Sequence, residues 1–405
     1  MSVDVIVPVF TDALRTSTSH QVGIKKLNDS LRSCDNKVEF INIILSGYFD
    51  KVLVCTKKDA SVERIVSFFS TFAASVAEDT DDSAFSTILH HLLTRTKADN
   101  KVVRGRACET LSHIFTKISD EVEFSSSLWN AVETGLLPLL RDKCANVRLW
   151  AVRAIKKFQN EEDLTIIKEI LRLMSSDPVK DIRAAATTAI VLKSMTLSEV
   201  VKKMEDISPD VRKAAVTKLT DPQLTIRHIP IEYRPRIVKN GLLDRNESVA
   251  TATACLIMKW FEQLNHSILR LFKCFDMLEH EKELNLVANC VLLELDTSKI
   301  YTSALKDSVF NQGIDQLKKA KKLKDVCVTS AEVYWVICRC EYAKGNWGIN
   351  AYQDLVSDIV PSMEALTKQM VCVSNSYKND ANGSGLSLFR WLLRLTAFVN
   401  SDELG

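Results

Sequence analysis

Basic side chains gather in three short stretches of the first 160 residues, and they are the residues of this sequence best suited to binding chemistry. Lysine and arginine hold phosphate groups through charge and through N–H donors, so such stretches are candidate contacts for the backbone of double-stranded DNA. A solvated helix surface is the alternative interpretation, and it is how a single run of charge usually behaves. The candidate DNA contacts are Lys57 and Lys58; Arg95, Lys97, Lys101, Arg104 and Arg106; and Arg141, Lys143, Arg153, Lys156 and Lys157.

The residue types that enzymes use for catalysis do not occur here in the spacings of known catalytic motifs. The seven histidines include the adjacent pair His90 and His91, but no HExxH motif, and the chain lacks GxSxG, GxxxxGK[ST] and GxGxxG. Cys338 and Cys340 are too close together for an ordinary zinc knuckle. The sequence therefore predicts neither an enzyme nor a bound metal or cofactor.

Length and composition favour a long helical array. At 405 residues the chain exceeds one ordinary core, and it has only 11 glycines and 8 prolines against 46% apolar residues. Few turn formers per residue suit long helices better than strands. The net charge is only +2, so any charge-based function must come from local clusters.

The cysteines and the N-terminus predict an intracellular location. The 11 cysteines are scattered without CxxC pairs, which favours a reducing compartment with free, mostly buried thiols. The opening MSVDVIVPVF has an acidic lead and no small-residue cleavage site, and no apolar run reaches about 18 residues. We therefore expect a soluble, unsecreted protein that does not enter membranes.

The third basic stretch belongs to a motif that repeats along the chain. In LLRDKCANVRLWAV the motif residues are Asp142, Val147, Arg148 and Ala151, and the same spacing returns in DPVKDIRAAA (177–186) and DISPDVRKAA (206–215). A shortened copy, DNKVVRGRA, precedes them, and in a degenerate copy, DRNESVATAT, Ala250 replaces the arginine. The apolar anchors of the copies are Val62, Val103, Val147, Ile182, Val211 and Val249.

Irregular steps near 40 residues are typical of HEAT-type repeats, in which each unit is a pair of antiparallel helices. Such pairs cannot bury their apolar faces alone, so they stack into an α-solenoid with an extended concave surface. The sequence therefore predicts an all-α HEAT-repeat fold, with the motif on the second helix of each pair. The aspartate can cap that helix, and the arginine can reach the aspartate of a neighbouring repeat. The residues of this structural ladder are Asp142, Arg148, Asp177, Arg183, Asp206 and Arg212.

A helical wheel explains why the motif helix carries so many cations. At about 100° per residue, Val147, Ala151, Ala154 and Phe158 form one buried stripe. The side chains of Arg153, Lys156 and Lys157 fall on the opposite side, so packing does not require them to be basic.

Segments in a fixed order make the chain similar to one known family, the condensin CAP-G proteins, which are HEAT-repeat non-SMC subunits. The segments are DKVLVCTKKDASVERIVSFFSTF (50–72), KVVRGRACETL (101–111), RDKCANVRLWAV (141–152), DPVKDIRAAA (177–186), VVKKMEDISPDVRKAA (200–215), GLLDRNESV (241–249), KWFEQLNHSILRLFKCFDM (259–277) and VYWVICRCEYAKGN (333–346). The early basic patch of the family is matched by Lys57 and Lys58, and its VR-x-R pattern by Arg104 and Arg106.

The resemblance implies a non-catalytic condensin component that binds the condensin kleisin, which is the H component of the complex, and grips double-stranded DNA in a basic concave groove. Through the kleisin it would join the pair of SMC ATPases that compacts mitotic chromosomes, which places it in the nucleus and on chromosomes with a cytoplasmic pool. The kleisin-binding residues are not identified.

The resemblance also implies a domain layout. We expect an N-terminal HEAT array over 1–325 and further helical repeats over 326–405, without the second array of the family, whose members run about twice as long. Whether the chain is a fragment or a naturally short form stays open. The alternative function is a HEAT scaffold or adaptor that binds protein partners without nucleic acid.

Overall fold

The computed structural model of the chain describes residues 3–56, 59–78, 82–159, 164–314, 330–376 and 384–400. Within these ranges every regular element is a helix, which confirms the predicted all-α class. The chain divides into two compact units, residues 1–203 and 204–405. The domain boundary predicted between residues 325 and 326 lies outside the described ranges and stays a prediction.

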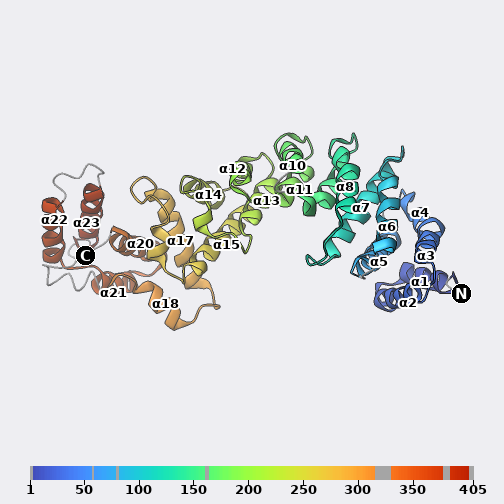
Figure 1. Cartoon of the computed structure of the whole chain (residues 1–405). Helices are drawn as coiled ribbons and strands as arrows, with labels where there is room; N and C mark the ends of the chain where they lie inside the picture. The colour runs from blue at the N-terminus through green and yellow to red at the C-terminus, as the bar shows by residue number, and fades with distance from the viewer. Residues whose placement is uncertain are drawn as a thin grey trace. The chain divides into compact units, whose positions relative to one another are not determined.

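The first unit contains twelve described α-helices with short 3₁₀ and π segments between them (Figure 1). The α-helices are α1 (Val3–Arg15), α2 (His20–Arg32), α3 (Lys37–Ile44), α4 (Asp50–Leu53), α5 (Ala60–Ala77), α6 (Asp82–Arg95), α7 (Lys101–Lys117), α8 (Ser126–Leu136), α9 (Ala145–Ile155), α10 (Thr165–Ser176), α11 (Lys180–Ala189) and α12 (Ser194–Lys202). The other segments are η1 (Ser17–Ser19), η2 (Leu45–Phe49), η3 (Leu137–Arg141) and η4 (Lys156–Phe158).

The second unit continues with helices of the same kind. Its described α-helices are α13 (Pro209–Leu219), α14 (Tyr233–Leu242), α15 (Glu247–Gln263), α16 (Ile268–Phe272), α17 (Glu281–Thr297), α18 (Ser303–Phe310), α20 (Ser330–Asn346), α21 (Ile349–Ile359), α22 (Met363–Ser376) and α23 (Ser384–Asn400). The 3₁₀ segments are η5 (Lys203–Glu205) and η6 (Ile226–His228). No helix of the described ranges is long and apolar enough to cross a bilayer.

The helices pack as pairs, and the second helices of successive pairs stack on one another. Helix α6 packs on α7, α8 on α9, α10 on α11, and α14 on α15. Within the first unit α5, α7, α9 and α11 follow one another as neighbours, and α13 packs beside α15 in the second. Because the connections within pairs are short, the two helices of a pair run in opposite directions. These stacked helices carry the repeated motif.

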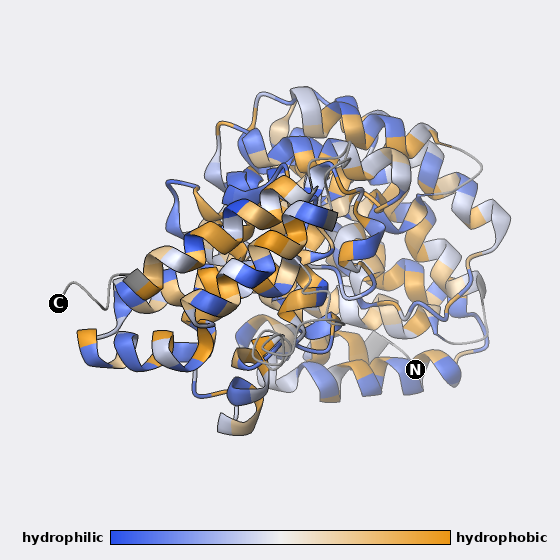
Figure 2. Ribbon diagram, turned by 90° about the vertical axis from the view of Figure 1, so that its left-hand side faces the viewer, coloured by the Kyte–Doolittle hydropathy of each residue, from blue (hydrophilic) through white to orange (hydrophobic). Residues whose placement is uncertain are grey.

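The predicted anchors form the core of the stack. The side chains of Val147, Ile182, Val211 and Val249 are at most 1% exposed, and Val62 and Val103 are 8% exposed. On α9 and η4 the stripe of Val147, Ala151, Ala154 and Phe158 is fully buried, which confirms the helical wheel. Figure 2 shows the same division, with hydrophobic and hydrophilic residues alternating along each helix.

The described cysteines are free thiols, but fewer are buried than the sequence predicted. Cys108, Cys338 and Cys340 are buried, whereas Cys255 and Cys372 are exposed and the other described cysteines lie between these extremes. Burial raises the pKa of Cys108 to about 12, so this thiol stays protonated at neutral pH.

Candidate nucleic-acid interface

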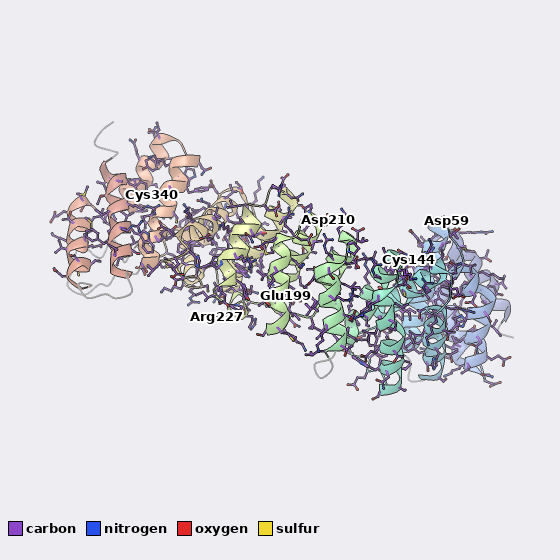
Figure 3. The ribbon with its side chains drawn as sticks, turned by 90° about the horizontal axis from the view of Figure 1, so that it is seen from above. Asp59, Cys144, Glu199, Asp210, Arg227 and Cys340 are labelled. Carbon is purple, nitrogen blue, oxygen red and sulfur yellow. The ribbon has the colours of Figure 1, made fainter. Side chains whose placement is uncertain are left out.

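The connections before α9, α11, α13 and α15 are turns built around an aspartate. The Asp142 carboxylate accepts a hydrogen bond from the backbone N–H of Cys144 at 2.7 Å, and Asp177 does the same for Val179 at 2.9 Å. In the second unit Asp206 accepts from Ser208 at 2.9 Å and Asp244 from Asn246 at 2.8 Å. In all four turns the aspartate accepts from the backbone N–H of the N-cap residue, not from an N–H of the first helical turn. The prediction that the aspartate itself caps the helix is therefore corrected. In α5 the cap residue is itself an aspartate, Asp59 (Figure 3).

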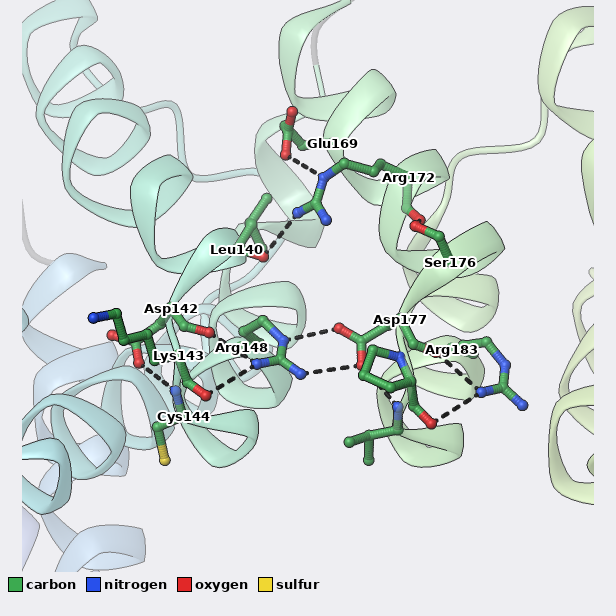
Figure 4. A network of polar contacts seen from close by, with 12 residues as sticks. Leu140, Asp142, Lys143, Cys144, Arg148, Glu169, Arg172, Ser176, Asp177 and Arg183 are labelled. Carbon is green, nitrogen blue, oxygen red and sulfur yellow. Dashed lines mark hydrogen bonds and ion pairs between the residues drawn. The ribbon is translucent and has the colours of Figure 1, made fainter.

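The motif arginine ties this turn to the next repeat. Arg148 donates to both carboxylate oxygens of Asp177, at 2.8 and 3.1 Å, and to the carbonyl oxygen of Asp142 at 2.8 Å (Figure 4). Arg212 does the same with Asp244, at 2.5 and 2.8 Å. Arg183, which is 8% exposed, donates to the carbonyl oxygen of Asp177 at 3.0 Å. One guanidinium thus closes its own turn and binds the following one.

Arg104 occupies the same place in an earlier repeat, although the sequence assigned it to DNA. Its guanidinium donates to both carboxylate oxygens of Asp142, at 2.8 and 3.2 Å. It also donates to the carbonyl oxygens of Ala98 and Asp99, at 2.9 and 2.8 Å. Four of its five N–H donors are used within the protein, so Arg104 belongs to the ladder.

Two of the ladder carboxylates, Asp142 and Asp244, have lowered pKa values. Burial alone would raise the pKa of Asp142, but hydrogen bonds from Arg104 and from the backbone N–H of Cys144 outweigh it and lower the pKa. The bond from Arg212 is the main reason that the pKa of Asp244 is lowered. Such buried charges stay ionised because each is paired and hydrogen-bonded.

Three more of the predicted DNA contacts are engaged by acidic side chains. Arg106 is 5% exposed and donates to Glu109 at 2.8 Å. Arg95 makes a two-pronged ion pair with Asp50, with Nε at 3.0 Å from the carboxylate. Arg141 is largely exposed, yet its Nε donates to Glu169 at 2.9 Å. The same Glu169 also accepts from Arg172, a contact that the sequence motifs did not predict (Figure 4).

Lys157 also holds the fold. Its ammonium donates to the carbonyl oxygen of Ile118, the C-cap residue of α7, at 2.8 Å and pairs with Asp120 at 2.7 Å. Lys259 of α15 makes the matching contact with Thr220, the C-cap residue of α13, at 3.0 Å. The expectation that packing does not require Lys157 to be basic is therefore wrong.

Five of the predicted DNA contacts have no acidic partner among the described residues. Lys97, Lys101, Lys143, Arg153 and Lys156 are exposed, and none of them forms an ion pair with another residue that the structure describes. We call these five the open cations. Lys57 and Lys58 lie outside the described residues.

The open cations lie in two places. Lys97, Lys101 and Lys143 lie in or beside the connections that precede α7 and α9, at the N-terminal ends of the motif helices. Arg153 and Lys156 lie at the other end of α9 and in η4, where they line a groove of about 630 Å³ between α7, α9 and α11. The open cations of the predicted stretches thus form two groups.

Small polar and aromatic side chains complete the groove. Helix α7 contributes Ser112, His113 and Thr116, and α11 contributes Asp181 and Thr188. Arg153 lies over the ring of Trp150, 4.7 Å from its centroid. The sequence motifs did not point to the α7 residues, although the spacing of His113 and Thr116 places them on one helix face. Within the described ranges no group of three side chains that could hold a metal ion occurs. The lining of the groove has two cations, Arg153 and Lys156, against one carboxylate, Asp181.

The comparisons with known proteins agree with the repeat architecture. A family model described as HEAT repeats matches residues 89–191, the part that contains α7, α9 and α11. Condensin complex subunit 3 of Xenopus laevis is 25% identical over 350 residues, which are 82% of this chain and 33% of that protein. The protein of the same description from Homo sapiens is 26% identical over 350 residues, 83% of this chain and 33% of the relative. The chain therefore spans about a third of the length of these relatives.

A solved structure shares the fold. The crystal structure of the Schizosaccharomyces pombe condensin Cnd3–Cnd2 subcomplex matches with a TM-score of 0.77 at 20% identity, over 97% of this chain and 48% of that one. The homologues of this chain are therefore condensin complex subunit 3 proteins, which are the CAP-G proteins that the sequence resembles, and its fold is an all-α HEAT-repeat solenoid.

Proposed function

We propose that the chain is a non-catalytic condensin component that binds double-stranded DNA through the open cations. The observation that carries this proposal is the groove between α7, α9 and α11, where Arg153 and Lys156 are exposed among small polar side chains. Neither cation serves the fold through an ion pair with a described residue, in contrast to Arg148 and Lys157. Exposed cations of this kind release counterions when they meet phosphates, which drives sequence-independent binding.

The spacing of the two groups suits a duplex. Lys143 and Lys156 are separated by the length of α9, roughly 20 Å at about 1.5 Å per residue. This separation exceeds the width of the major groove of B-DNA, about 12 Å, so the two groups can contact phosphates of both strands only where the duplex lies across α9. We infer that one strand lies along Lys97, Lys101 and Lys143 and the other along Arg153 and Lys156.

Paired arginines are left out of this interface for a physical reason. Arg104 and Arg106 would have to break buried ion pairs with Asp142 and Glu109 before reaching a phosphate. Leaving a buried carboxylate without its partner costs several kcal/mol, on the order of 3–5 kcal/mol. Arg95 and Arg141 are more exposed and could exchange partners at lower cost.

The proposal includes the kleisin as protein partner. The solved relative is described as a Cnd3–Cnd2 subcomplex, and this chain shares its fold. We propose that this chain likewise binds the condensin kleisin and through it joins the SMC ATPase pair on mitotic chromosomes in the nucleus. A pull-down of the full chain with the kleisin tests this part, and retention at high salt is the expected result.

The DNA part is tested by comparing two double variants. Arg153→Gln with Lys156→Gln should weaken binding of a short duplex at least severalfold and leave the melting temperature unchanged. Lys168→Gln with Lys202→Gln, on α10 and α12, removes the same charge away from the groove and should have little effect. If both double variants bind DNA like the parent, the groove is only a solvated surface, and a scaffold without nucleic acid becomes the better interpretation.

A further inference from the structure

A histidine stands in the basic groove beside the open cations. His113 of α7 is half-buried and lines the groove together with Arg153 and Lys156. Its ring centroid lies 5.4 Å from that of Trp150, and the guanidinium of Arg153 lies over the same indole. An imidazole, an indole and a guanidinium therefore form one wall, with the imidazole next to the place where a phosphate would be held.

We propose that His113 is a further phosphate-binding residue and that it takes up a proton when DNA enters the groove. The inference rests on the proposed function, since it needs DNA to occupy this groove. It adds a regulatory property, because a histidine changes charge within the range of cellular pH.

Burial and the neighbouring charges together lower the pKa of His113 in the free protein. Burial is the main cause that lowers the pKa of His113 below its ordinary value, and the positive fields of Lys117 and Arg153 lower it further. Glu109, one turn earlier on α7, opposes this effect, although its carboxylate also accepts a hydrogen bond from Arg106. Lys156 from η4 and Asp181 from α11, which carry opposite charges, line the same groove.

A bound phosphate reverses this balance. It brings negative charge to the open side of the groove, where it favours the imidazolium over the neutral ring. The bound form then holds more protons than the free form, so DNA affinity must rise as pH falls through the range between the two pKa values. Below the pKa of the free protein both forms are protonated, and the affinity levels off.

The test measures duplex affinity of the full chain at pH 7.5 and pH 5.5 at constant salt. A shift of about half to one pKa unit on binding predicts a gain of about three- to tenfold at the lower pH. His113→Gln should remove this gain, while His113→Arg should bind tightly at both pH values. His90→Gln, on the exposed side of α6, is the matched control and should keep the gain. Melting temperatures establish that each variant is folded.

Calorimetry supplies an independent readout. In two buffers with different ionisation enthalpies, DNA binding near pH 6.5 should take up a fraction of a proton, and His113→Gln should abolish that uptake. If His113→Gln keeps the full pH gain, the inference is overturned while DNA binding by the groove stands. If the parent chain binds no duplex at either pH, the proposed function and this inference fall together.

Discussion

Two adjacent lysines show that basic residues in one stretch can serve opposite purposes. Lys156 is exposed at the rim of the groove, whereas the ammonium of Lys157 reaches back to α7 and binds the carbonyl oxygen of Ile118. The carbonyl groups at a helix C-terminus lack partners within the helix, so a cation placed there stabilises the end of α7.

The pair gives a sharp test at the residue scale. Lys157→Gln should lower the free energy of unfolding by about 1–2 kcal/mol, because the carbonyl of Ile118 loses a charged donor and Asp120 its partner. Lys156→Gln should leave it within about 0.5 kcal/mol, as usual for surface changes. Chemical denaturation of the two variants decides the matter, and equal stability would return Lys157 to the open cations.

The wheel located the buried stripe of α9 because burial follows helical periodicity. It could not separate Lys156 from Lys157, since the partners of Lys157 come from the connection after α7 and not from its own helix. One signal was available in the sequence. Lys259 lies at the same distance from its N-cap residue, Asn246, as Lys157 from Cys144, and it makes the same contact with the preceding repeat.

At the scale of elements, the ladder connects the turn before a motif helix to the neighbouring repeat. Asp142 and Asp177 each shape their own turn and also accept hydrogen bonds from the arginine of the preceding repeat. The sequence predicted such pairs because the spacing recurred. The sequence did not show that Arg104 belongs to these pairs, since its repeat has Ala98 at the position where the later copies have aspartate.

The ladder predicts a pH-dependent contribution to stability. Because Arg212 lowers the pKa of Asp244 in the folded chain, this pair stabilises the fold above the ordinary aspartate pKa of about 3.9, and the contribution is lost as pH falls through the lowered value. Arg212→Gln should therefore cost about 2–4 kcal/mol at pH 7. The difference from the parent should shrink below about pH 4.

An exposed pair is the control for that experiment. Arg236→Gln breaks the ion pair with Glu205, whose partners are 39% and 50% exposed, and should cost less than about 1 kcal/mol. Thermal melts of both variants across the pH range make the comparison. A constant difference for Arg212→Gln down to pH 3 would show that the carboxylate of Asp244 does not titrate with the ladder.

Close packing of α14 against α15 depends on one glycine. A Cβ atom on Gly241 would lie 2.2 Å from Oγ1 of Thr253, whose side chain is fully buried. Gly241→Ala should therefore destabilise by about 1–3 kcal/mol although alanine is the better helix former. Gly345→Ala in α20 meets no atom within 4 Å, so it should be neutral or stabilise by up to about 1 kcal/mol. Melting temperatures that rise in both variants would rule out the close contact.

At the scale of the whole molecule, composition and repeats sufficed for the fold class, because stacked helix pairs leave a periodic record in the sequence. The same periodic pattern gives little information about which residues bind a ligand. A net charge of +2 does not tell which cations are already paired. Only the contacts in the structure distinguish Arg106, which pairs with Glu109, from Arg153, which lies over Trp150. Half of the ten predicted contacts that the structure describes are engaged by acids, and the other half stay open.

The open cations predict how DNA affinity depends on salt. Each phosphate contact contributes about 0.9 to the slope of log affinity against log salt. Replacing Arg153 and Lys156 by glutamine should therefore flatten the slope by about 1.8, and replacing Lys97, Lys101 and Lys143 by about 2.7.

The two effects should add, because the groups lie at opposite ends of α9 and share no partner. They should also be alike for duplexes of different sequence, since backbone contacts do not identify bases. Titrations of a labelled duplex between about 50 and 200 mM salt measure these slopes. If the triple variant of Lys97, Lys101 and Lys143 keeps the parent slope while the variant of Arg153 and Lys156 has a flatter one, the duplex does not extend to the N-terminal ends of the motif helices, and only the groove holds it.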